Sequence, residues 1–398
     1  MTAVASRALP RALGAFAGFG VELEYMIVRS DTLDVLPIAD RVVNDEPSWS
    51  NELVRHVIEL KNPRPSADLH RLAASFASQV RSMNAALERF GACLMPSAMH
   101  PWMDPRAETQ LWPRENAEIY RAYDRIFDCR SHGWANLQSM HVNLPFADDR
   151  EFGRLHAAAR LALPLIPALA ASSPFVDGRA TGFMDYRLEA YRLNCRPVPQ
   201  MNGAMIPEPV ASRTQYEREV LRPLYDALAP HDPQGVLCHE WANARGAIAR
   251  FDRNAIEIRV VDVQECPAAD IALAAVIIDL VRLFYDEDRK PQPATAELAE
   301  ILRSCMRDGE RARVDSPVYG ARGEAREVWR ALAQRMRDAP HRALWQPFLD
   351  FVLEKGPLAR RLVQAVGNHV SRENLAPLYA KLCGCLENDR LFEPSSSS

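Results

Sequence analysis

The sequence predicts an α+β protein in which antiparallel strands come first and helices fill the C-terminal portion. Two observations support this prediction. Three well separated stretches alternate apolar and polar side chains, as half-buried strands do, and other stretches repeat apolar residues every three or four positions, as amphipathic helices do. The 398 residues contain no internal repeat, long linker or sharp shift in composition. We therefore expect a single domain rather than two.

Composition and charge exclude several classes of function. With 48% hydrophobic and 25% charged residues, the chain has the make-up of an ordinary soluble globular protein, and its formal net charge of −4 gives no reason to expect nucleic acid or a membrane surface as a partner. The segment Met1–Phe19 lacks the apolar core of a signal peptide, and no run approaches the roughly 18–20 apolar residues of a membrane span. Eight cysteines without C-x-x-C spacing suggest free thiols in a reducing compartment. We expect a cytoplasmic protein.

The stretch from Gly20 to Val28 is predicted to be a strand with an acidic face. Its odd-numbered positions from Val21 to Ile27 are apolar, whereas Glu22 and Glu24 share the other face with Cα atoms about 6.6 Å apart. Two such carboxylates repel each other unless a cation lies between them or water reaches both. A solvated strand face explains this pattern equally well when it is taken alone.

The segments that follow alternate between short strands and helices. The run Val35–Ile38 comes after a turn and is expected to pair with the first strand at a sheet edge. Glu52–Leu60 is a further apolar element with acidic residues near both ends. The other elements expected in this part are a helix over Ser66–Phe90, a strand over Ala92–Pro96 and a helix over Glu115–Phe127.

Residues 138–144 show the second strand pattern. Ser139, His141 and Asn143 face one way, and the residues between them are apolar. A lone histidine on a strand is more often structural than a ligand, but Asn143 on the same face strengthens the case for a site.

A helix, a loop and an irregular segment separate this strand from the last one. Residues 151–171 are helical and strongly apolar, and Pro164 and Pro167 are expected to kink or break the helix. The small-residue loop at 171–182 is expected to lie over a site or at a subunit contact. The proline-rich section from Tyr186 to Val210 is expected to be ordered but irregular.

The last strand pattern, over residues 255–263, places Glu257 and Arg259 on one face. A surface ion pair is the simplest explanation of an acid beside a base on a strand. An apolar helix is predicted over residues 268–285, and the remainder alternates helical patterns with short breaks.

The motifs acquire a shared meaning from their order: a strand with E-x-E, an E-x6-E stretch, a strand with H-x-N, a small-residue loop followed by arginine, and a strand with E-x-R. In this order they resemble the glutamate–cysteine ligase type 2 family, the carboxylate–amine ligases that share the glutamine synthetase catalytic fold. The A-S-S-P-F-x-x-G-x-x-T-G string is the most specific part of the resemblance. The residues that carry it are Gly20–Glu24, Glu52–Leu60, Met99–Pro101, Met140–Asn143, Ala170–Phe175, Gly178–Gly182, Arg187 and Ile256–Asp262.

The resemblance implies a curved antiparallel sheet of about six strands that forms a funnel, with helices packed outside. It implies one glutamine synthetase-like catalytic domain over residues 1–398, with a motif-bearing core at about 18–285 and a helical part at about 286–392. In this fold metal ions and arginines replace the glycine-rich phosphate loop, so the absence of a G-x-x-x-x-G-K-[ST] motif does not count against ATP.

The same resemblance assigns metal ligands. Glu24 and Glu59 would hold one divalent cation, and Glu22, His141 and Glu257 would hold another. Magnesium, or manganese in its place, suits these oxygen-rich ligands, which accept an occasional histidine.

Arginines and polar residues complete the implied site. Arg259 is expected to meet phosphate oxygens, and Arg187 is the second catalytic arginine, expected to bind a substrate carboxylate or the nucleotide phosphates. The residues expected to bind substrate or nucleotide are Glu52, Asn143 and Arg245.

Three details depart from the family pattern. Many relatives read H-x-H where this chain has His141 and then Asn143, so an amide stands in place of a second histidine. Glu52 and Glu59 are seven positions apart and would face opposite sides of an unbroken strand, in which case only Glu59 would reach the metals. The stretch Trp241–Arg245 has one residue more than the family segment W-x-x-R.

The resemblance leads to one main hypothesis and two alternatives. The main hypothesis is an ATP-dependent ligase that activates a carboxylate, first of all the γ-carboxylate of glutamate, as an acyl phosphate and joins it to an amine, with cysteine as the family's acceptor. The alternatives are a guanidino-type phosphotransferase of the same superfold and a non-catalytic binding protein that keeps the fold. The expected partners are small-molecule substrates, and a homodimer is allowed as the assembly.

Overall fold

The computed structural model describes residues 12–43, 47–367 and 369–394. The ends of the chain, including most of the segment examined for a signal peptide, lie outside the described residues. The strands are β1 (Gly20–Arg29), β2 (Trp49–Asn51), β3 (Val57–Lys61), β4 (Ala92–Met95), β5 (Ser139–Pro145), β6 (Phe175–Val176), β7 (Arg179–Ala180), β8 (Ala247–Arg250), β9 (Ala255–Asp262), β10 (Arg313–Val314) and β11 (Gly323–Glu324).

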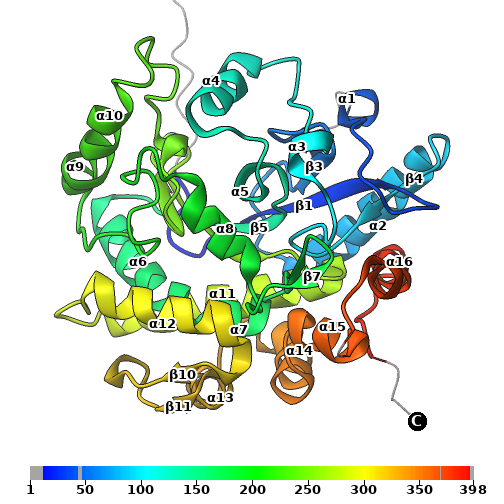
Figure 1. Cartoon of the computed structure of the whole chain (residues 1–398). Coiled ribbons are helices and arrows are strands. Elements are labelled where there is room, and N and C mark those ends of the chain that lie inside the picture. Colours follow the sequence, from blue (N-terminus) through cyan, green and yellow to red (C-terminus); the bar gives the residue numbers. More distant parts are fainter. Residues whose placement is uncertain (1–11, 44–46, 368, 395–398) are drawn as a thin grey trace, which may run out of the picture.

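Helices make up most of the rest of the described chain (Figure 1). The helices of the first half are α1 (Ala39–Val42), α2 (Leu69–Glu88), α3 (Pro105–Glu108), α4 (Ala117–Phe127), α5 (His132–Ala135), α6 (Asp149–Ala162), η1 (Leu163–Leu165), α7 (Pro167–Ala170) and α8 (Tyr186–Asn194). Those of the second half are α9 (Arg213–Tyr216), η2 (Glu217–Leu221), α10 (Arg222–Leu228), η3 (Glu240–Ala242), α11 (Pro267–Glu287), α12 (Thr295–Asp308), η4 (Gly309–Arg311), η5 (Pro317–Tyr319), α13 (Ala325–Arg335), α14 (Arg342–Lys355), α15 (Leu358–Val366) and α16 (Arg372–Glu387).

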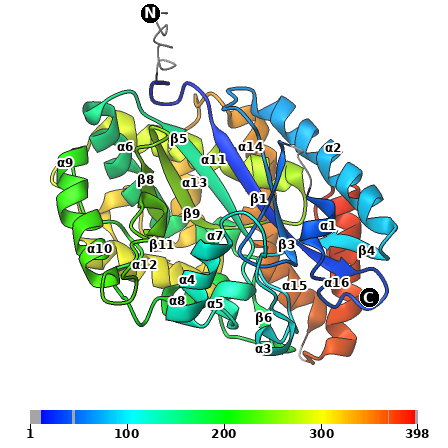
Figure 2. The same ribbon diagram turned by 90° about the horizontal axis from the view of Figure 1, so that it is seen from above.

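A seven-stranded sheet forms the centre of the fold, with the strand order β2-β3-β1-β5-β9-β8 and with β4 also paired to β1. Every strand pair within it is antiparallel. Figure 2 shows β1 and β5 crossing the middle of the molecule side by side. The antiparallel sheet predicted from the sequence is therefore confirmed, with seven strands in place of about six.

Alternation within β1 separates the two faces of the sheet. Val21, Leu23 and Tyr25 are fully buried and belong to the main hydrophobic core, which extends into the C-terminal helices. The Tyr25 hydroxyl lies 3.5 Å from Asp270 Oδ2 of α11, so this face is directed toward α11. In Figure 1, α11, α12 and α14 lie below the sheet and α4 and α5 lie above it. None of the described helices combines the length and apolarity needed to cross a membrane.

Most of the longer predicted elements are present, and the differences have local causes. The strands predicted over 20–28, 138–144 and 255–263 are β1, β5 and β9, and the break expected at Pro164 and Pro167 separates α6 from α7. The predicted strand Val35–Ile38 is shortened to one antiparallel bridge: Val35 pairs with Val28 of β1 as expected, but Pro37 has no N–H to continue the ladder.

Two further differences bear on the site. The segment from Tyr186, expected to be irregular, begins with the helix α8, which the Asp185 side chain caps by accepting a hydrogen bond from the Leu188 N–H. The loop at 171–182 contains the small β6–β7 hairpin, and Ser172 and Ser173 at its start are fully buried.

Candidate functional site

The register of the sheet brings polar residues of three strands onto the face opposite α11. Glu24 of β1 is paired with Glu59 of β3. Glu22 is paired with Lys61 of β3 on one side and with His141 of β5 on the other. Paired residues of antiparallel strands point to the same face, so acidic residues far apart in the sequence become neighbours here.

These side chains form two overlapping groups of potential metal ligands. The ligand atoms of Glu22, Glu59 and His141 lie within 4.8 Å of one another, and so do those of Glu24, Glu52 and Glu59. Glu59 belongs to both groups. Glu24, Glu59 and His141 are each only 7% exposed, so the carboxylates are largely shielded from the water that would otherwise relieve their repulsion.

Glu52 reaches this cluster because the chain turns back on itself. The sequence treats Glu52–Leu60 as one element, but β2 ends at Asn51 and β3 begins at Val57, and the two strands form an antiparallel hairpin. The expectation that only Glu59 would reach the other carboxylates is therefore wrong in geometry. Glu52 leaves the end of β2 and meets Glu59 from the facing side of the hairpin.

His141 is hydrogen-bonded at both ring nitrogens. Nδ1 lies 3.0 Å from Glu22 Oε2, and Nε2 lies 3.0 Å from Ser139 Oγ. The Ser139 hydroxyl and backbone N–H both donate to Glu24 Oε2, at 3.0 and 2.6 Å. Since Ser139 has one hydroxyl hydrogen, it accepts from His141, whose doubly protonated ring satisfies both contacts. Burial alone would lower the pKa of His141, but the hydrogen bond to Glu22 and the charge of Glu24 raise it.

The charge balance differs across the cluster. Burial and the charges of Glu24 and Glu59 raise the pKa of Glu52 well above its ordinary value. Burial and Glu22 likewise raise the pKa of Glu59, although Lys61 Nζ is 2.6 Å from Glu59 Oε1. Lys61 alone does not neutralise these groups, so the Glu24–Glu52–Glu59 end has an excess of negative charge.

Glu22 lies at the better neutralised end. Burial alone would raise its pKa, but the hydrogen bond and charge of His141, together with Lys61 and Arg253, lower it to about 2. Asn143 Nδ2 donates to Glu22 Oε1 at 3.2 Å. Asn143 Oδ1 is buried and accepts no hydrogen bond from the described residues, which leaves an oxygen free beside the carboxylates.

Glu257 and Arg259 bind each other next to the cluster. Arg259 Nε is 2.9 Å from Glu257 Oε1, and Arg250 Nη1 is 3.1 Å from Glu257 Oε2. Glu257 Oε1 also lies 4.0 Å from His141 Nδ1. An ion pair is therefore present, but Glu257 is 2% exposed, so the pair is not the surface pair that the strand pattern allowed. Glu257 therefore lies beside His141, and each of its carboxylate oxygens is paired with an arginine.

Arg187 enters the site from α8 and is held by Asp262. Its Nε donates to Asp262 Oδ1 at 2.5 Å, and Asp262 Oδ2 accepts from the Ser172 N–H and the Ser173 hydroxyl, each at 2.8 Å. The β5–β9 register shifts between Met140 and Val142, and such a bulge reverses the alternation beyond it. Asp262 therefore comes to the functional face although plain alternation from Glu257 would point it away.

Arg245 lies outside this arrangement. Its guanidinium makes two 2.7 Å hydrogen bonds to the carboxylate of Glu208 and donates to the Gln200 carbonyl at 3.1 Å. Arg245 is not among the residues that line the cavity. The sequence expectation that Arg245 binds substrate or nucleotide has no counterpart in this geometry, because the planar fork is already filled.

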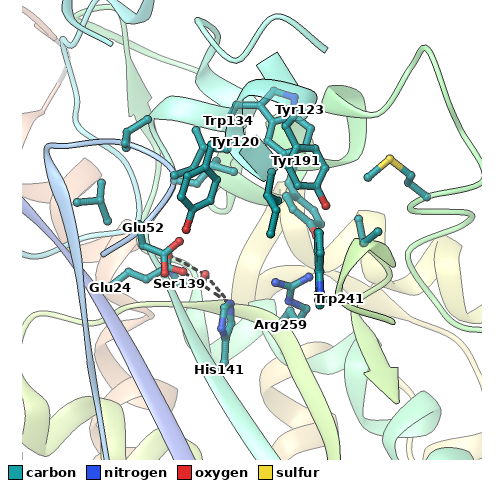
Figure 3. A pocket seen from close by; sticks show the side chains of 18 of the residues that line it. Glu24, Glu52, Tyr120, Tyr123, Trp134, Ser139, His141, Tyr191, Trp241 and Arg259 are labelled. Atoms are coloured by element: carbon teal, nitrogen blue, oxygen red, sulfur yellow. Dashed lines mark hydrogen bonds and ion pairs between the residues drawn. The ribbon is translucent and has the colours of Figure 1, made fainter. Parts of the chain in front are cut away.

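A cavity of about 420 Å³ opens above the cluster. Its polar floor comes from the sheet, the hairpin and α8 and consists of Glu24, Glu52, Ser139, His141, Arg187 and Arg259. Its upper part, which we call the aromatic chamber, consists of Tyr120, Tyr123, Trp134, Tyr191 and Trp241. Figure 3 shows the rings of Tyr120, Tyr123, Trp134 and Tyr191 above Glu52 and His141, with Trp241 beside Arg259.

Several residues at the site were not identified from the sequence. Lys61 stands two positions after Glu59 on the same strand face, and Ser139 two before His141, so alternation identifies both once the strands are accepted. The place of Asp262 on the functional face could be predicted only if the bulge were known. The aromatic chamber draws on α4, α5, α8 and η3, and no sequence pattern links these segments before they fold.

Carboxylates, a histidine and two arginines meet at the floor of one cavity, which is a set of donors that suits divalent cations and anionic groups. Residues 18–381 match the family model described as glutamate-cysteine ligase family 2. The chain therefore belongs to this family of ligases.

Individual proteins agree with the family assignment. An uncharacterised protein of Archaeoglobus fulgidus is 32% identical over 385 residues, which cover 94% of this chain and 99% of that protein. A Bradyrhizobium protein named "Putative glutamate--cysteine ligase 2" is 28% identical over 281 residues, which cover 67% of this chain and 62% of that protein. The crystal structure of glutamate–cysteine ligase from Francisella tularensis in complex with AMP superposes with a TM-score of 0.64 over 95% of this chain and 90% of that chain. At 11% identity this likeness concerns the fold.

Proposed function

We propose that the protein is an ATP-dependent carboxylate–amine ligase, which activates a carboxylate as an acyl phosphate and joins it to an amine. The acid we propose is glutamate, through its γ-carboxylate, and the cofactor is Mg²⁺ or Mn²⁺. The observation that carries the proposal is the pair of ligand groups that share Glu59, set beside Arg187 and Arg259 at the floor of one cavity.

The chemistry explains why such a site is needed. A carboxylate does not react with an amine in water, because hydroxide is a poor leaving group. Transfer of the terminal phosphoryl group of ATP to the carboxylate supplies phosphate as the leaving group, which the amine then displaces. The site must hold two anionic substrates together and neutralise charge on the phosphoryl group in transit.

The residues fit divalent cations by their donor chemistry. Glu22, Glu59 and His141 would hold one ion, once His141 gives up the proton on its ligating ring nitrogen, and Glu24, Glu52 and Glu59 would hold a second. This grouping differs from the one implied by family resemblance, because Glu52 joins and Glu257 stays with its arginines. The raised pKa of Glu52 and Glu59 fits a cluster that lacks positive charge. When bound, such ions polarise the reacting oxygens and neutralise phosphate charge.

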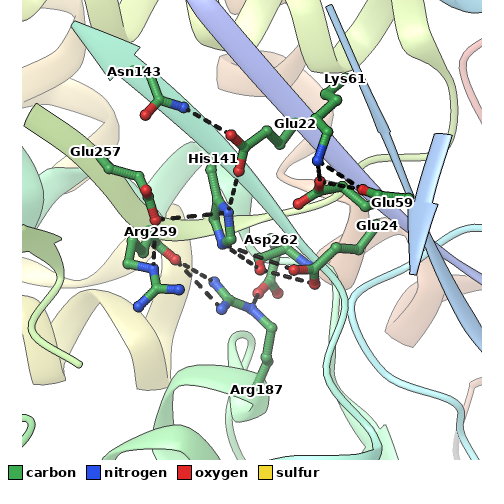
Figure 4. Close-up of polar contacts among 12 residues, drawn as sticks. Glu22, Glu24, Glu59, Lys61, His141, Asn143, Arg187, Glu257, Arg259 and Asp262 are labelled. Carbon is green, nitrogen blue, oxygen red and sulfur yellow. Dashed lines mark hydrogen bonds and ion pairs between the residues drawn. The ribbon is translucent and has the colours of Figure 1, made fainter. Parts of the chain in front are cut away.

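Basic side chains lie at both ends of the site and could bind the two anionic substrates. Lys61 and Arg253 flank Glu22, with side chains 37% and 54% exposed, and Arg253 Nη1 lies 3.9 Å from Glu22 Oε1. We assign the nucleotide phosphates to this end. We assign the acid substrate to the other end, where Arg187 and Arg259 line the cavity. Figure 4 shows Glu22 and Lys61 at one end of the cluster and Arg187 at the other.

Phosphate release and acyl trapping test the proposal. The purified protein is incubated with ATP, Mg²⁺ and a panel of acids that includes glutamate, with hydroxylamine as a small acceptor that captures acyl phosphates as hydroxamates. We expect phosphate and hydroxamate in equal amounts with glutamate. Phosphate transfer to a guanidino compound without phosphate release would identify a guanidino kinase instead, and no turnover with any acid would refute the proposal.

A further inference from the structure

We propose that the amine joined by this ligase carries no carboxylate and has an apolar or aromatic substituent. This inference rests on the proposed function and deepens it by naming the class of acceptor. It departs from cysteine, the acceptor in the family's name. The argument depends on where the aromatic chamber lies, what lines it and which charges it lacks.

The chamber lies at the end of the site away from the proposed nucleotide phosphates. Glu22 pairs with His141 in the antiparallel β1–β5 register, so Glu24 and Ser139 lie toward one end of these strands and Gly20 and Asn143 toward the other. Glu24 and Ser139 line the cavity, whereas Glu22 and Asn143 do not. A molecule in the chamber would therefore approach the reacting carbon from the side opposite the exposed cations near Glu22.

The walls of the chamber are mostly apolar, and the polar groups among them are uncharged: Asn116 and the hydroxyls of the tyrosines. The rings of Tyr123 and Trp134 have centroids 5.0 Å apart, and those of Tyr123 and Trp241 are 6.2 Å apart. Phe127 stacks behind Trp134 with a centroid distance of 5.3 Å. Aliphatic side chains complete the lining, namely Leu53, Val54, Val57, Ile119, Leu137 and Met201. Packed aromatic and aliphatic walls favour an apolar substituent, because its transfer from water is favourable.

The positively charged side chains that line the cavity already have acidic partners. Among the described residues that line it, the arginines are Arg187 and Arg259, and no lysine is present. Arg187 is bound to Asp262, and Arg259 to Glu257, with N–O distances of 2.5 and 2.9 Å. Both arginines belong to the floor, where the anionic acid substrate and the transferring phosphoryl group require them.

An amino acid acceptor would bring one more anion than this cavity can pair. The carboxylate of cysteine is ionised at neutral pH, and within the chamber it would meet no cation: the walls are aromatic and aliphatic side chains with the uncharged Asn116, and Glu24 on the floor is acidic. A charge buried without a partner is strongly disfavoured. An amine whose substituent is uncharged avoids this cost and gains from contact with the walls.

The reaction remains balanced with such an acceptor. The neutral amine nitrogen attacks the carbonyl carbon of the acyl phosphate, and a C–N bond forms. The bond between that carbon and the phosphate oxygen breaks, the phosphate departs with the electron pair, and one proton passes from the nitrogen to the phosphate. No oxidant, reductant or further co-reactant is needed.

Matched pairs of amines isolate the effect of the carboxylate. Cysteine is compared with cysteamine, alanine with ethylamine, and phenylalanine with 2-phenylethylamine, in the presence of ATP, Mg²⁺ and glutamate. We expect kcat/KM to be higher for the decarboxylated member of every pair, on the order of 100-fold. Along the series ethylamine, propylamine and butylamine, we expect kcat/KM to rise about fourfold for each added methylene.

A substitution in the chamber tests whether its aromatic wall causes the preference for apolar amines. In Trp241→Leu the ratio of kcat/KM for 2-phenylethylamine over ethylamine should fall about tenfold. The matched control is Trp102→Leu, since Trp102 packs against His100 and Tyr379 and does not line the cavity. The control should leave the ratio at its original value.

The outcomes separate this inference from the proposed function. Preference for cysteine over cysteamine, with hydroxamate still formed from glutamate and hydroxylamine, would overturn the inference and leave the ligase proposal standing. An unchanged amine ratio in Trp241→Leu would also overturn it. Absence of hydroxamate with every acid would overturn the ligase proposal itself, and the inference with it.

Discussion

Replacing Asp262 with asparagine tests whether a buried charge fixes the catalytic arginine of α8. Asp262 is fully buried and Arg187 is 2% exposed. The described residues give Arg187 one ion-pair partner, Asp262, at 2.5 Å. Asparagine has the same shape, and its oxygen at the Oδ2 position still accepts the hydrogen bonds from the Ser172 N–H and the Ser173 hydroxyl. Its NH2 group then replaces Oδ1 and cannot accept from the Arg187 Nε–H. The substitution therefore removes the charge and the hydrogen bond to Arg187 but keeps the shape and the contacts with the loop.

The size of the effect follows from the burial of the pair. Loss of one partner of a buried ion pair costs about 3–5 kcal/mol, because the other charge stays buried without compensation. We take about 3 kcal/mol for Asp262→Asn because the hydrogen bonds to the amide oxygen remain. At roughly 2.1 cal/mol/K per residue, unfolding 398 residues has an entropy near 0.8 kcal/mol/K, so Tm should fall by about 3–4 °C.

Asp185 supplies a matched control two residues before Arg187. Burial and the charge of Asp262 raise the pKa of Asp185 well above its ordinary value, and no described basic side chain forms an ion pair with this carboxyl. Asp185→Asn therefore breaks no ion pair of Arg187 and keeps an oxygen to accept the Leu188 N–H that caps α8. We expect its Tm to stay within about 1 °C of the original.

Calorimetry or circular dichroism provides Tm, and phosphate release with glutamate and hydroxylamine provides the activity. The double variant Arg187→Met with Asp262→Asn should be less destabilised than the sum of the single variants by about 2–3 kcal/mol, since neither charge remains. Equal Tm values for Asp262→Asn and Asp185→Asn would refute the reasoning, and so would an additive double variant.

Three further predictions concern the metal cluster and its arginine. Glu22→Gln removes a ligand charge at constant volume and should lower phosphate release on the order of 100-fold without changing the circular dichroism spectrum; a rate near the original would contradict the grouping of Glu22 with Glu59 and His141. Arg259→Lys should lower kcat by about 100-fold, because an ammonium cannot bond two oxygens of the acid substrate or of the transferring phosphoryl group as a guanidinium fork does, and an unchanged kcat would make Arg259 a structural partner of Glu257. In metal-free protein, the raised pKa of Glu52 means that the folded state keeps a proton that the unfolded chain releases near 4.5, so Tm should fall as the pH rises above that value. This decline should be weaker in Glu52→Gln and should disappear when Mg²⁺ is added, as thermal scans between pH 5 and 8 would show.

The parts of the fold that alternation determines could be predicted from the sequence. In β1, β5 and β9 one face is apolar and buried, so the sequence alone shows which side chains share the opposite face. For this reason the polar pattern of the strands is enough to assign Glu22, Glu24 and His141 to one surface. The pattern of a single strand does not determine how it is aligned with its partner strand. The sequence therefore did not show which of these residues would be neighbours.

The structure differs from the sequence interpretation, or adds to it, where hairpins, short helices and distant partners determine the geometry. Glu52 and Glu59 converge because a hairpin connection, absent from the sequence interpretation, lies between β2 and β3. The helix α8 was missed because the prolines that follow it in the sequence concealed its short helical pattern. Arg245 was carried over from a motif match, and its partner Glu208, 37 positions earlier, is visible only in the fold.

The bulge in β5 and β9 shows how a local irregularity completes the site. Without it, Asp262 would point to the apolar side of the sheet, where a carboxylate costs stability. With it, Asp262 is paired with Ser139 on the functional face and reaches both the small-residue loop and Arg187. The small-residue loop and the strand therefore act through one carboxylate: the loop orients Asp262, and Asp262 orients the arginine. The sequence patterns identified the loop, the strand and the arginine separately. They are linked because the bulge turns Asp262 to the functional face, and a regular two-residue alternation does not predict a bulge.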